Sequence, residues 1–140
     1  MAGVAFEVPA EVAFDYLADP RHRPEWQSSL RRVELLDDEV AVGQRWIDVT
    51  MPGMRPRMET TALDRPTSWT EAGRWGGVEA VLTLRFVSTG AGCLVEPEFS
   101  LSGRGAARVA LPVLRLLATP AVRSDLRRAA GILSARHPGH

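Results

Sequence analysis

The sequence predicts a single α+β domain in which a curved antiparallel sheet of about seven strands wraps around a long C-terminal helix. Three observations carry this prediction. A short amphipathic segment follows an initial strand, a long middle region repeats apolar residues with a period of two, and the period becomes three or four residues after Gly105. A sheet with one apolar face needs a cover, and the terminal helix is the element available to provide it.

The N-terminal region predicts one strand and two short helices. Residues 2–8 alternate weakly and stop before Pro9, which suits a strand followed by the first turn of a helix. The next nine residues place apolar side chains on one side and acidic side chains on the other. Asp19-Pro20 ends this helix, because the residue before a proline is pushed away from helical angles, and residues 21–26 predict a second short helix.

The middle of the chain predicts six further strands separated by turn residues such as Pro52-Gly53 and Gly76-Gly77. They cover residues 30–36, 44–51, 55–64, 68–75, 78–86 and 93–101. In the last two strands, alternation predicts one inward apolar face, and Pro97 favours an edge position or a bulge. This face comprises Val78, Ala80, Leu82, Leu84, Phe86, Cys93, Val95, Pro97, Phe99 and Leu101.

The C-terminal region has helical periodicity. We expect residues 106–118 to form a buried helix that is too short for a membrane span. Pro120 interrupts the pattern, with Thr119 as a plausible N-cap, which predicts either a kinked helix or two abutting helices. Residues 137–140 are expected to fray. The predicted apolar face comprises Leu111, Leu114, Ala118, Val122, Leu126, Ala129 and Leu133.

Composition narrows the classes of partner. The 140 residues suit one domain, and the 17 acidic and 17 basic residues balance, which argues against nucleic acid and favours a neutral partner. One cysteine cannot form an intramolecular disulfide, and the N-terminus shows no signal peptide, so we expect a cytoplasmic protein. We expect no stable membrane insertion, and either a monomer or a homodimer.

The order of elements and several local motifs resemble the START-like (SRPBCC) helix-grip superfamily of bacterial and other proteins. The resemblance rests on the run from Val8 to Pro20, on Trp26, on the Val42-Gly43 turn and on the Arg65-Pro66 turn. It covers nearly the whole chain, residues 1–140, as one domain. This superfamily includes the polyketide cyclase/dehydrase and lipid-transport families, and the resemblance implies an apolar pocket between the sheet and the C-terminal helix.

Several kinds of site find no support in the sequence. His22, His137 and His140 are scattered or terminal and Cys93 has no partner at ligand spacing, so no metal site is expected. Gly76-Gly77 lies between strands rather than before a helix, so no phosphate loop and no cofactor are predicted. Cys93 falls on the apolar face of its strand and is expected to pack there.

The candidate ligand-binding residues are aromatic, apolar or polar side chains that could line the pocket. Any of the strand tryptophans could equally belong to the core. Among the polar strand residues Asp48, Arg57, Glu59 and Glu71, we expect most to point outward. The candidates are Trp26, Trp46, Arg57, Trp69, Glu71, Trp75, Leu82, Leu84, Phe86, Phe99, Leu114 and Arg115.

Three functions remain open from the sequence. The first is binding of a hydrophobic small molecule such as a lipid, polyketide or aromatic metabolite. The second is a polyketide cyclase or aromatase that uses a pocket acid or base, with Arg57 or Glu71 as the residues of choice. The third is a protein-interaction module whose core is filled by its own side chains.

Overall fold

The computed structural model of the chain describes residues 3–138. The predicted strand start at Ala2 and the terminal Gly139-His140 lie outside the described residues. The elements are, in order, β1 (Val4–Phe6), α1 (Ala10–Ala18), the 3₁₀ helix η1 (Pro20–His22), α2 (Arg23–Trp26), β2 (Leu30–Leu35), β3 (Arg45–Thr50), β4 (Arg57–Asp64), β5 (Ser68–Trp75), β6 (Val78–Ser88), β7 (Cys93–Gly103) and α3 (Ala107–Arg136).

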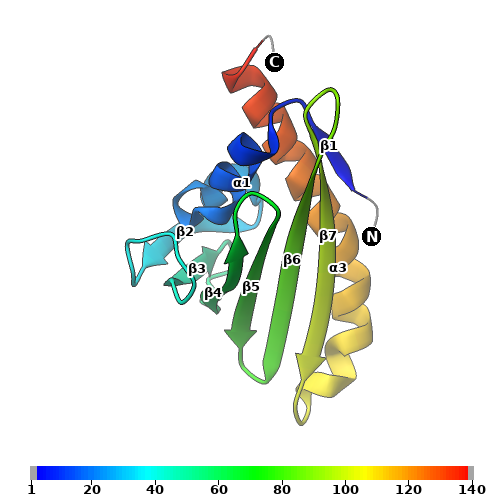
Figure 1. The fold of residues 1–140 in the computed structure, drawn as a ribbon. Coiled ribbons are helices and arrows are strands. Elements are labelled where there is room, and N and C mark those ends of the chain that lie inside the picture. Colours follow the sequence, from blue (N-terminus) through cyan, green and yellow to red (C-terminus); the bar gives the residue numbers. More distant parts are fainter. Residues whose placement is uncertain (1–2, 139–140) are drawn as a thin grey trace.

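One curved antiparallel sheet contains all seven strands, in the order β1-β7-β6-β5-β4-β3-β2. Figure 1 shows α3 crossing the sheet beside β7 and β1, and α1 lying near one end of the sheet. The α+β fold, the seven strands, the short helices after the first strand and the long terminal helix are confirmed.

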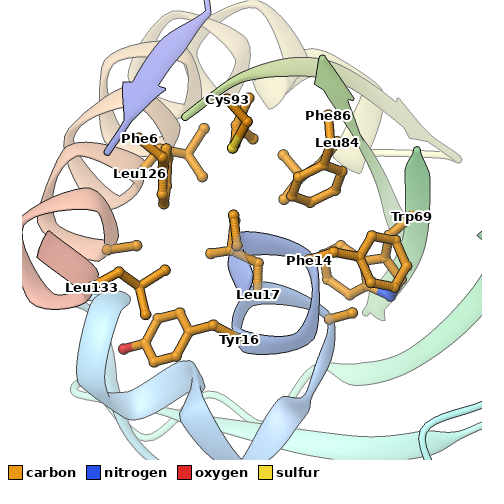
Figure 2. Close-up of a cluster of buried hydrophobic side chains, with 14 of the residues drawn as sticks. Phe6, Phe14, Tyr16, Leu17, Trp69, Leu84, Phe86, Cys93, Leu126 and Leu133 are labelled. Carbon is orange, nitrogen blue, oxygen red and sulfur yellow. The ribbon is translucent and has the colours of Figure 1, made fainter. Parts of the chain in front are cut away.

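The hydrophobic core lies between α1, the C-terminal half of α3 and one end of the sheet (Figure 2). Phe14 of α1 packs against Phe86 of β6 with ring centroids 5.2 Å apart and planes tilted by 59°. Leu17 and Leu126 have no exposed surface. This end of the molecule is filled by side chains, so the core fixes where α3 lies on the sheet.

The helix α3 differs from the sequence prediction in two ways. It continues through both Pro112 and Pro120 as one element, so the prediction of two abutting helices is wrong. Thr119 lies inside the helix, where its hydroxyl donates to the carbonyl of Arg115 at 3.4 Å, and it is not an N-cap. Each proline removes one backbone donor from the helix, but packing of the C-terminal half onto the core stabilises α3 despite this loss.

The N-terminal half of α3 is exposed, although residues 106–118 were expected to be buried. Val109 is 84% exposed and Leu116 75%, whereas Leu111 is buried. Only one side of this half faces the sheet, and the apolar residues occur on all sides of it, so most of them meet solvent. An apolar composition alone therefore did not indicate burial here.

Pro97 lies in β7, an inner strand of the sheet. The pairing of β1 with β7 covers Val4↔Val95 to Phe6↔Cys93, so Pro97 lies just beyond it. Among residues 3–138, Pro97 pairs only with Leu84 of β6, so its missing backbone donor removes no bond of the described β1–β7 ladder. β7 is therefore not an edge strand, although Pro97 itself lies beyond the described pairing with β1.

Candidate functional site: a cavity between the sheet and the terminal helix

A cavity of about 450 Å³ lies between the sheet and the N-terminal and middle turns of α3. Its residues come from α2 and the segment that follows it, from β2 to β7, from the loop between β3 and β4, and from α3. Most are apolar. They are Arg23, Trp26, Gln27, Ser29, Leu30, Asp48, Thr50, Met54, Pro56, Met58, Glu71, Gly73, Trp75, Val78, Ala80, Leu82, Phe99, Leu101, Leu114, Ala118, Val122, Asp125 and Leu126.

The pairing of the strands determines which sheet residues lie next to one another in the cavity lining. Leu82 lies opposite Phe99, and Ala80 opposite Leu101, so the pairs form neighbouring rows on the inner face. Gly73 of β5 adjoins Met58 of β4, and a methyl group added at Gly73 would lie 2.7 Å from Sδ of Met58. Gly73 therefore lets the Met58 side chain lie directly against the backbone of β5, and the small side chain of Ala80 leaves room that a larger one would fill.

The cavity opens at the end of the sheet away from the core. Trp75 is 54% exposed, and Met54 and Leu114 are each 38% exposed, while all three line the cavity. These residues belong to β5, to the loop between β3 and β4, and to α3. They are the exposed apolar residues at the opening of the cavity, which we call its mouth.

The inner end of the cavity carries a buried ionic cluster around Arg23. Its Nε and Nη2 donate to the two oxygens of Asp48 at 3.0 and 2.7 Å, and its Nη1 donates to Oε2 of Glu71 at 2.6 Å. Trp46 donates its indole N–H to Oδ1 of Asp48 at 3.0 Å, and the guanidinium lies 5.2 Å from the Trp46 ring centroid. All these side chains are nearly inaccessible to solvent.

Local structure explains why these polar side chains point inward. Arg23 and Trp26 are three residues apart in α2 and share one face of that short helix. Asp48 follows Trp46 by two residues in β3, and Glu71 follows Trp69 by two residues in β5. A period of two puts each acid on the same buried side as the tryptophan before it.

The cluster contains two acids, Asp48 and Glu71, for one base, Arg23, and this imbalance together with burial shifts the pKa values of its side chains. Burial raises the pKa of Glu71 above its usual value; Arg23 opposes this shift, and the nearby Asp48 adds to it. Burial acts to lower the pKa of Arg23, but Asp48 and Glu71 outweigh it and raise that pKa. Arg23 therefore stays a cation, and Glu71 takes a proton more readily than a glutamate in water does.

Two further polar groups lie in the lining. Oδ1 of Asp125, on α3, accepts hydrogen bonds from the backbone N–H and the hydroxyl of Ser28, both at 3.3 Å. Burial raises the pKa of Asp125, and the Ser28 hydrogen bonds oppose the shift. The buried indole N–H of Trp26 has no hydrogen-bond partner among the described residues.

The structure brings half of the predicted site residues together. Trp26, Glu71, Trp75, Leu82, Phe99 and Leu114 line the cavity. Trp46, Trp69, Leu84 and Phe86 are buried outside its lining, in the core cluster. Arg57 is exposed on β4, and Arg115 donates to the carbonyl of Leu101 at 2.7 Å without lining the cavity.

Sequence reasoning missed Arg23, Asp48 and Asp125 as site residues. Asp48 and Glu71 were expected among residues that mostly point outward, and both are buried. The sequence did contain a signal for burial, which is the spacing from a tryptophan. Asp48 and Glu71 each lie two residues after a tryptophan on a strand, and Arg23 lies three residues before Trp26 in a helix. The prediction placed these side chains outside because they are charged, although their positions in the strands and the helix indicated the buried side. Charged side chains can be buried where partners of opposite charge lie next to them.

Other chemistry receives no support from this structure. Within residues 3–138, no group of three or more His, Cys, Asp or Glu side chains has the arrangement to hold a metal ion. Cys93 packs in the core as expected, and burial raises the pKa of its thiol to about 11. No helix of the described residues is long and apolar enough to cross a membrane.

Comparison with protein families decides the family. Residues 2–137 match the model of the family described as "Polyketide cyclase / dehydrase and lipid transport". The chain belongs to this family. The resemblance to the START-like helix-grip superfamily is thereby confirmed. No curated protein matches the sequence at a significant level.

Solved structures share the fold of this polyketide cyclase/dehydrase and lipid-transport family member. A START superfamily protein from Mycobacterium smegmatis matches with a TM-score of 0.78 and 11% identity, over 96% of each chain. Protein MLL2253 from Mesorhizobium loti matches with a TM-score of 0.72 and 16% identity, also over 96% of each chain. The di-domain ARO/CYC StfQ of the steffimycin biosynthetic pathway matches with a TM-score of 0.75 and 15% identity, over 96% of this chain and 49% of that one.

Proposed function

We propose that this protein binds a hydrophobic small molecule in the cavity between its sheet and α3. The observation that carries the proposal is the open cavity of about 450 Å³. Ligand pockets in proteins typically span roughly 300–1,000 Å³ and combine an apolar lining with a few polar groups. The aliphatic and aromatic lining supplies affinity by removing apolar ligand surface from water, and the Arg23 cluster orients the ligand at the inner end.

The experiment is native mass spectrometry of the purified protein, followed by thermal shift with neutral lipids, sterols and aromatic polyketides. A ligand that binds the folded state alone raises the melting temperature as its concentration rises above Kd. We expect at least one neutral class to do so. Absence of a bound species and of any shift, with these neutral classes and with cationic and anionic aromatic compounds, would contradict the proposal.

A matched pair of α3 variants tests whether binding occurs in this cavity. Ala118→Phe places an aromatic ring into the lining, whereas Ala121→Phe places it on the exposed side of the same helix. The expected result is loss of the thermal shift in the first variant and its retention in the second. Equal shifts in both would place the ligand elsewhere.

Polyketide cyclisation is the second candidate, and the environment of Glu71 favours it. A carboxyl group whose pKa is raised by burial holds its proton more readily than a free glutamic acid does, which suits the role of a general acid or base. The likeness to a cyclase of the steffimycin pathway supports the same reaction class. Glu71→Gln should then abolish turnover of an aromatic polyketide precursor while the precursor still binds.

The remaining hypothesis, a protein-interaction module, requires a core filled by its own side chains. The cavity supports the two ligand hypotheses over it. The cytoplasmic location, the monomeric or dimeric state, and the expectation that nucleic acid and cofactors are not partners stay predictions.

A further inference from the structure

The charges that line the cavity are unequal in number. Within the described part of the chain, the charged residues of the lining are Arg23, Asp48, Glu71 and Asp125. One is a cation and three are acids. The excess of acid is local, because the whole chain has 17 basic and 17 acidic residues.

Arg23 has no donor left for an anionic ligand. Three of its N–H groups serve Asp48 and Glu71. With the side-chain amide of Gln27 turned so that its oxygen faces Arg23, that oxygen accepts from Nη2 at 3.0 Å and from Nη1 at 3.3 Å. A guanidinium has five N–H donors, so protein acceptors occupy all of them.

The acids, in contrast, keep acceptor capacity. Glu71 accepts from Arg23 through Oε2, and Oε1 takes no part in that bond. Asp125 accepts from Ser28 through Oδ1 at the long distance of 3.3 Å, and Oδ2 takes no part in those bonds. A carboxylate can accept about four hydrogen bonds, so both side chains can receive a donor from the cavity.

We propose that the natural ligand joins an apolar body to a protonated amine, and that Glu71 and Asp125 receive this amine at the inner end of the cavity. The inference rests on the proposed function, since it concerns the ligand of the same cavity. A cation offsets the excess of buried acid, whereas a ligand carboxylate adds a further negative charge where no donor of Arg23 is free to meet it.

Three probes with one aromatic body and different head groups test the charge preference. They are naphthylethylamine, which is a cation at neutral pH, the neutral naphthylethanol and the anionic naphthylacetate. Their dissociation constants are measured by calorimetry at pH 7 and low ionic strength. The amine should bind more tightly than the acetate by roughly tenfold or more, with the alcohol between them, because like charges brought together in a binding site are strongly unfavourable.

Two variants connect the preference to the acids. Glu71→Gln and Asp125→Asn keep the size of each side chain and remove its charge, so each should narrow the gap between amine and acetate while the alcohol still binds. Glu79→Gln is the matched control, because Glu79 pairs with Arg74 at the surface and does not line the cavity. It should leave all three dissociation constants unchanged.

The results of these measurements distinguish failure of the amine proposal from failure of the proposed ligand-binding function. Tighter binding of the amine that weakens in the Glu71 and Asp125 variants supports the proposal. Binding of the acetate as tightly as the amine, or a preference that both variants retain, overturns it while the proposed function stands. Failure of all three probes and of the neutral lipid, sterol and polyketide classes overturns both.

Discussion

Arg23 holds two acids that would otherwise be buried without a counter-charge. It joins α2 to β3 through Asp48 and to β5 through Glu71, with both ion pairs nearly inaccessible to solvent. Taking such groups out of water is costly, and removal of one partner leaves the others uncompensated. The cluster is therefore a condition for the inner end of the cavity to stay formed.

Replacement of Arg23 measures that dependence. Arg23→Met keeps an unbranched chain but leaves Asp48 and Glu71 without their cation, so it should lower the free energy of unfolding by about 3–5 kcal/mol. Urea denaturation followed by tryptophan fluorescence provides the measurement. Arg57→Met, at an exposed position of β4, is the control and should change stability by less than about 0.5 kcal/mol. Equal effects would mean that the buried cluster adds nothing.

The pKa of Glu71 predicts how stability depends on pH. A pKa raised by folding means that the folded state binds the proton more tightly, so Glu71 favours folding at acidic pH and this contribution is lost as pH rises through the raised pKa. Glu71→Gln has no ionisable group at this position, so it avoids the decrease in stability that ionisation of Glu71 causes at higher pH. The variant should match the wild type near pH 4 and be more stable than it at pH 8, as measured by urea denaturation across that range.

Asp15 supplies a control of opposite sign. The hydrogen bond from Arg65 holds the pKa of Asp15 below its usual value, so its contribution is present at neutral pH and lost on acidification. Asp15→Asn should therefore be slightly less stable than the wild type at pH 8 and equal to it at low pH. If Glu71→Gln followed the same course, the excess-acid account of the cluster would be wrong.

At the scale of the element, α3 has two halves with different roles. The C-terminal half inserts Leu126, Ala129 and Leu133 into the core. The N-terminal half contributes Leu114 and Ala118 to the cavity lining and exposes most of its other apolar side chains. Val122, Asp125 and Leu126 also line the cavity, so the turn between the two halves belongs to both the core and the cavity.

Two leucine truncations in α3 compare a packed position with an exposed one. Leu126→Ala leaves a void at a site with no exposed surface and should lower the free energy of unfolding by about 2–5 kcal/mol. Leu116→Ala removes the same atoms at a position that is 75% exposed, and should cost less than about 0.5 kcal/mol. Chemical denaturation of both variants checks this. Similar losses would show that the exposed half is packed in solution.

At the scale of the whole molecule, burial predicts a gradient of local stability. Residues 126–136 include the side chains that pack in the filled core, whereas residues 107–125 lie over the cavity or meet solvent. Opening costs least where few apolar contacts are lost, so hydrogen exchange should be faster in residues 107–125 than in residues 126–136. A cavity ligand should slow exchange mainly in residues 107–125, and exchange that is uniform along α3, with and without ligand, would count against the gradient.

The sequence predicted the architecture well because hydrophobic periodicity and turn residues depend on neighbours along the chain. It placed all seven strands and predicted the inward face of β6 and β7, which the burial of Leu84 and Val95 confirms. It predicted the burial of the N-terminal half of α3 less well, because exposure of Val109 and Leu116 depends on how far α3 extends beyond its anchoring residues. It missed Arg23, since the acids that compensate it lie 25 and 48 residues further along the chain.

The sheet is divided between a filled end and a hollow end, and this division has an evolutionary consequence. Substitutions at Val78, Ala80 or Leu114 reshape the hollow end, while the packing of Phe14 against Phe86 is left intact. Mutations at these three positions should therefore change the shape of the cavity with little risk of unfolding. Under the proposed function, single substitutions at the hollow end would exchange one ligand for another in a descendant of this protein while its fold persists.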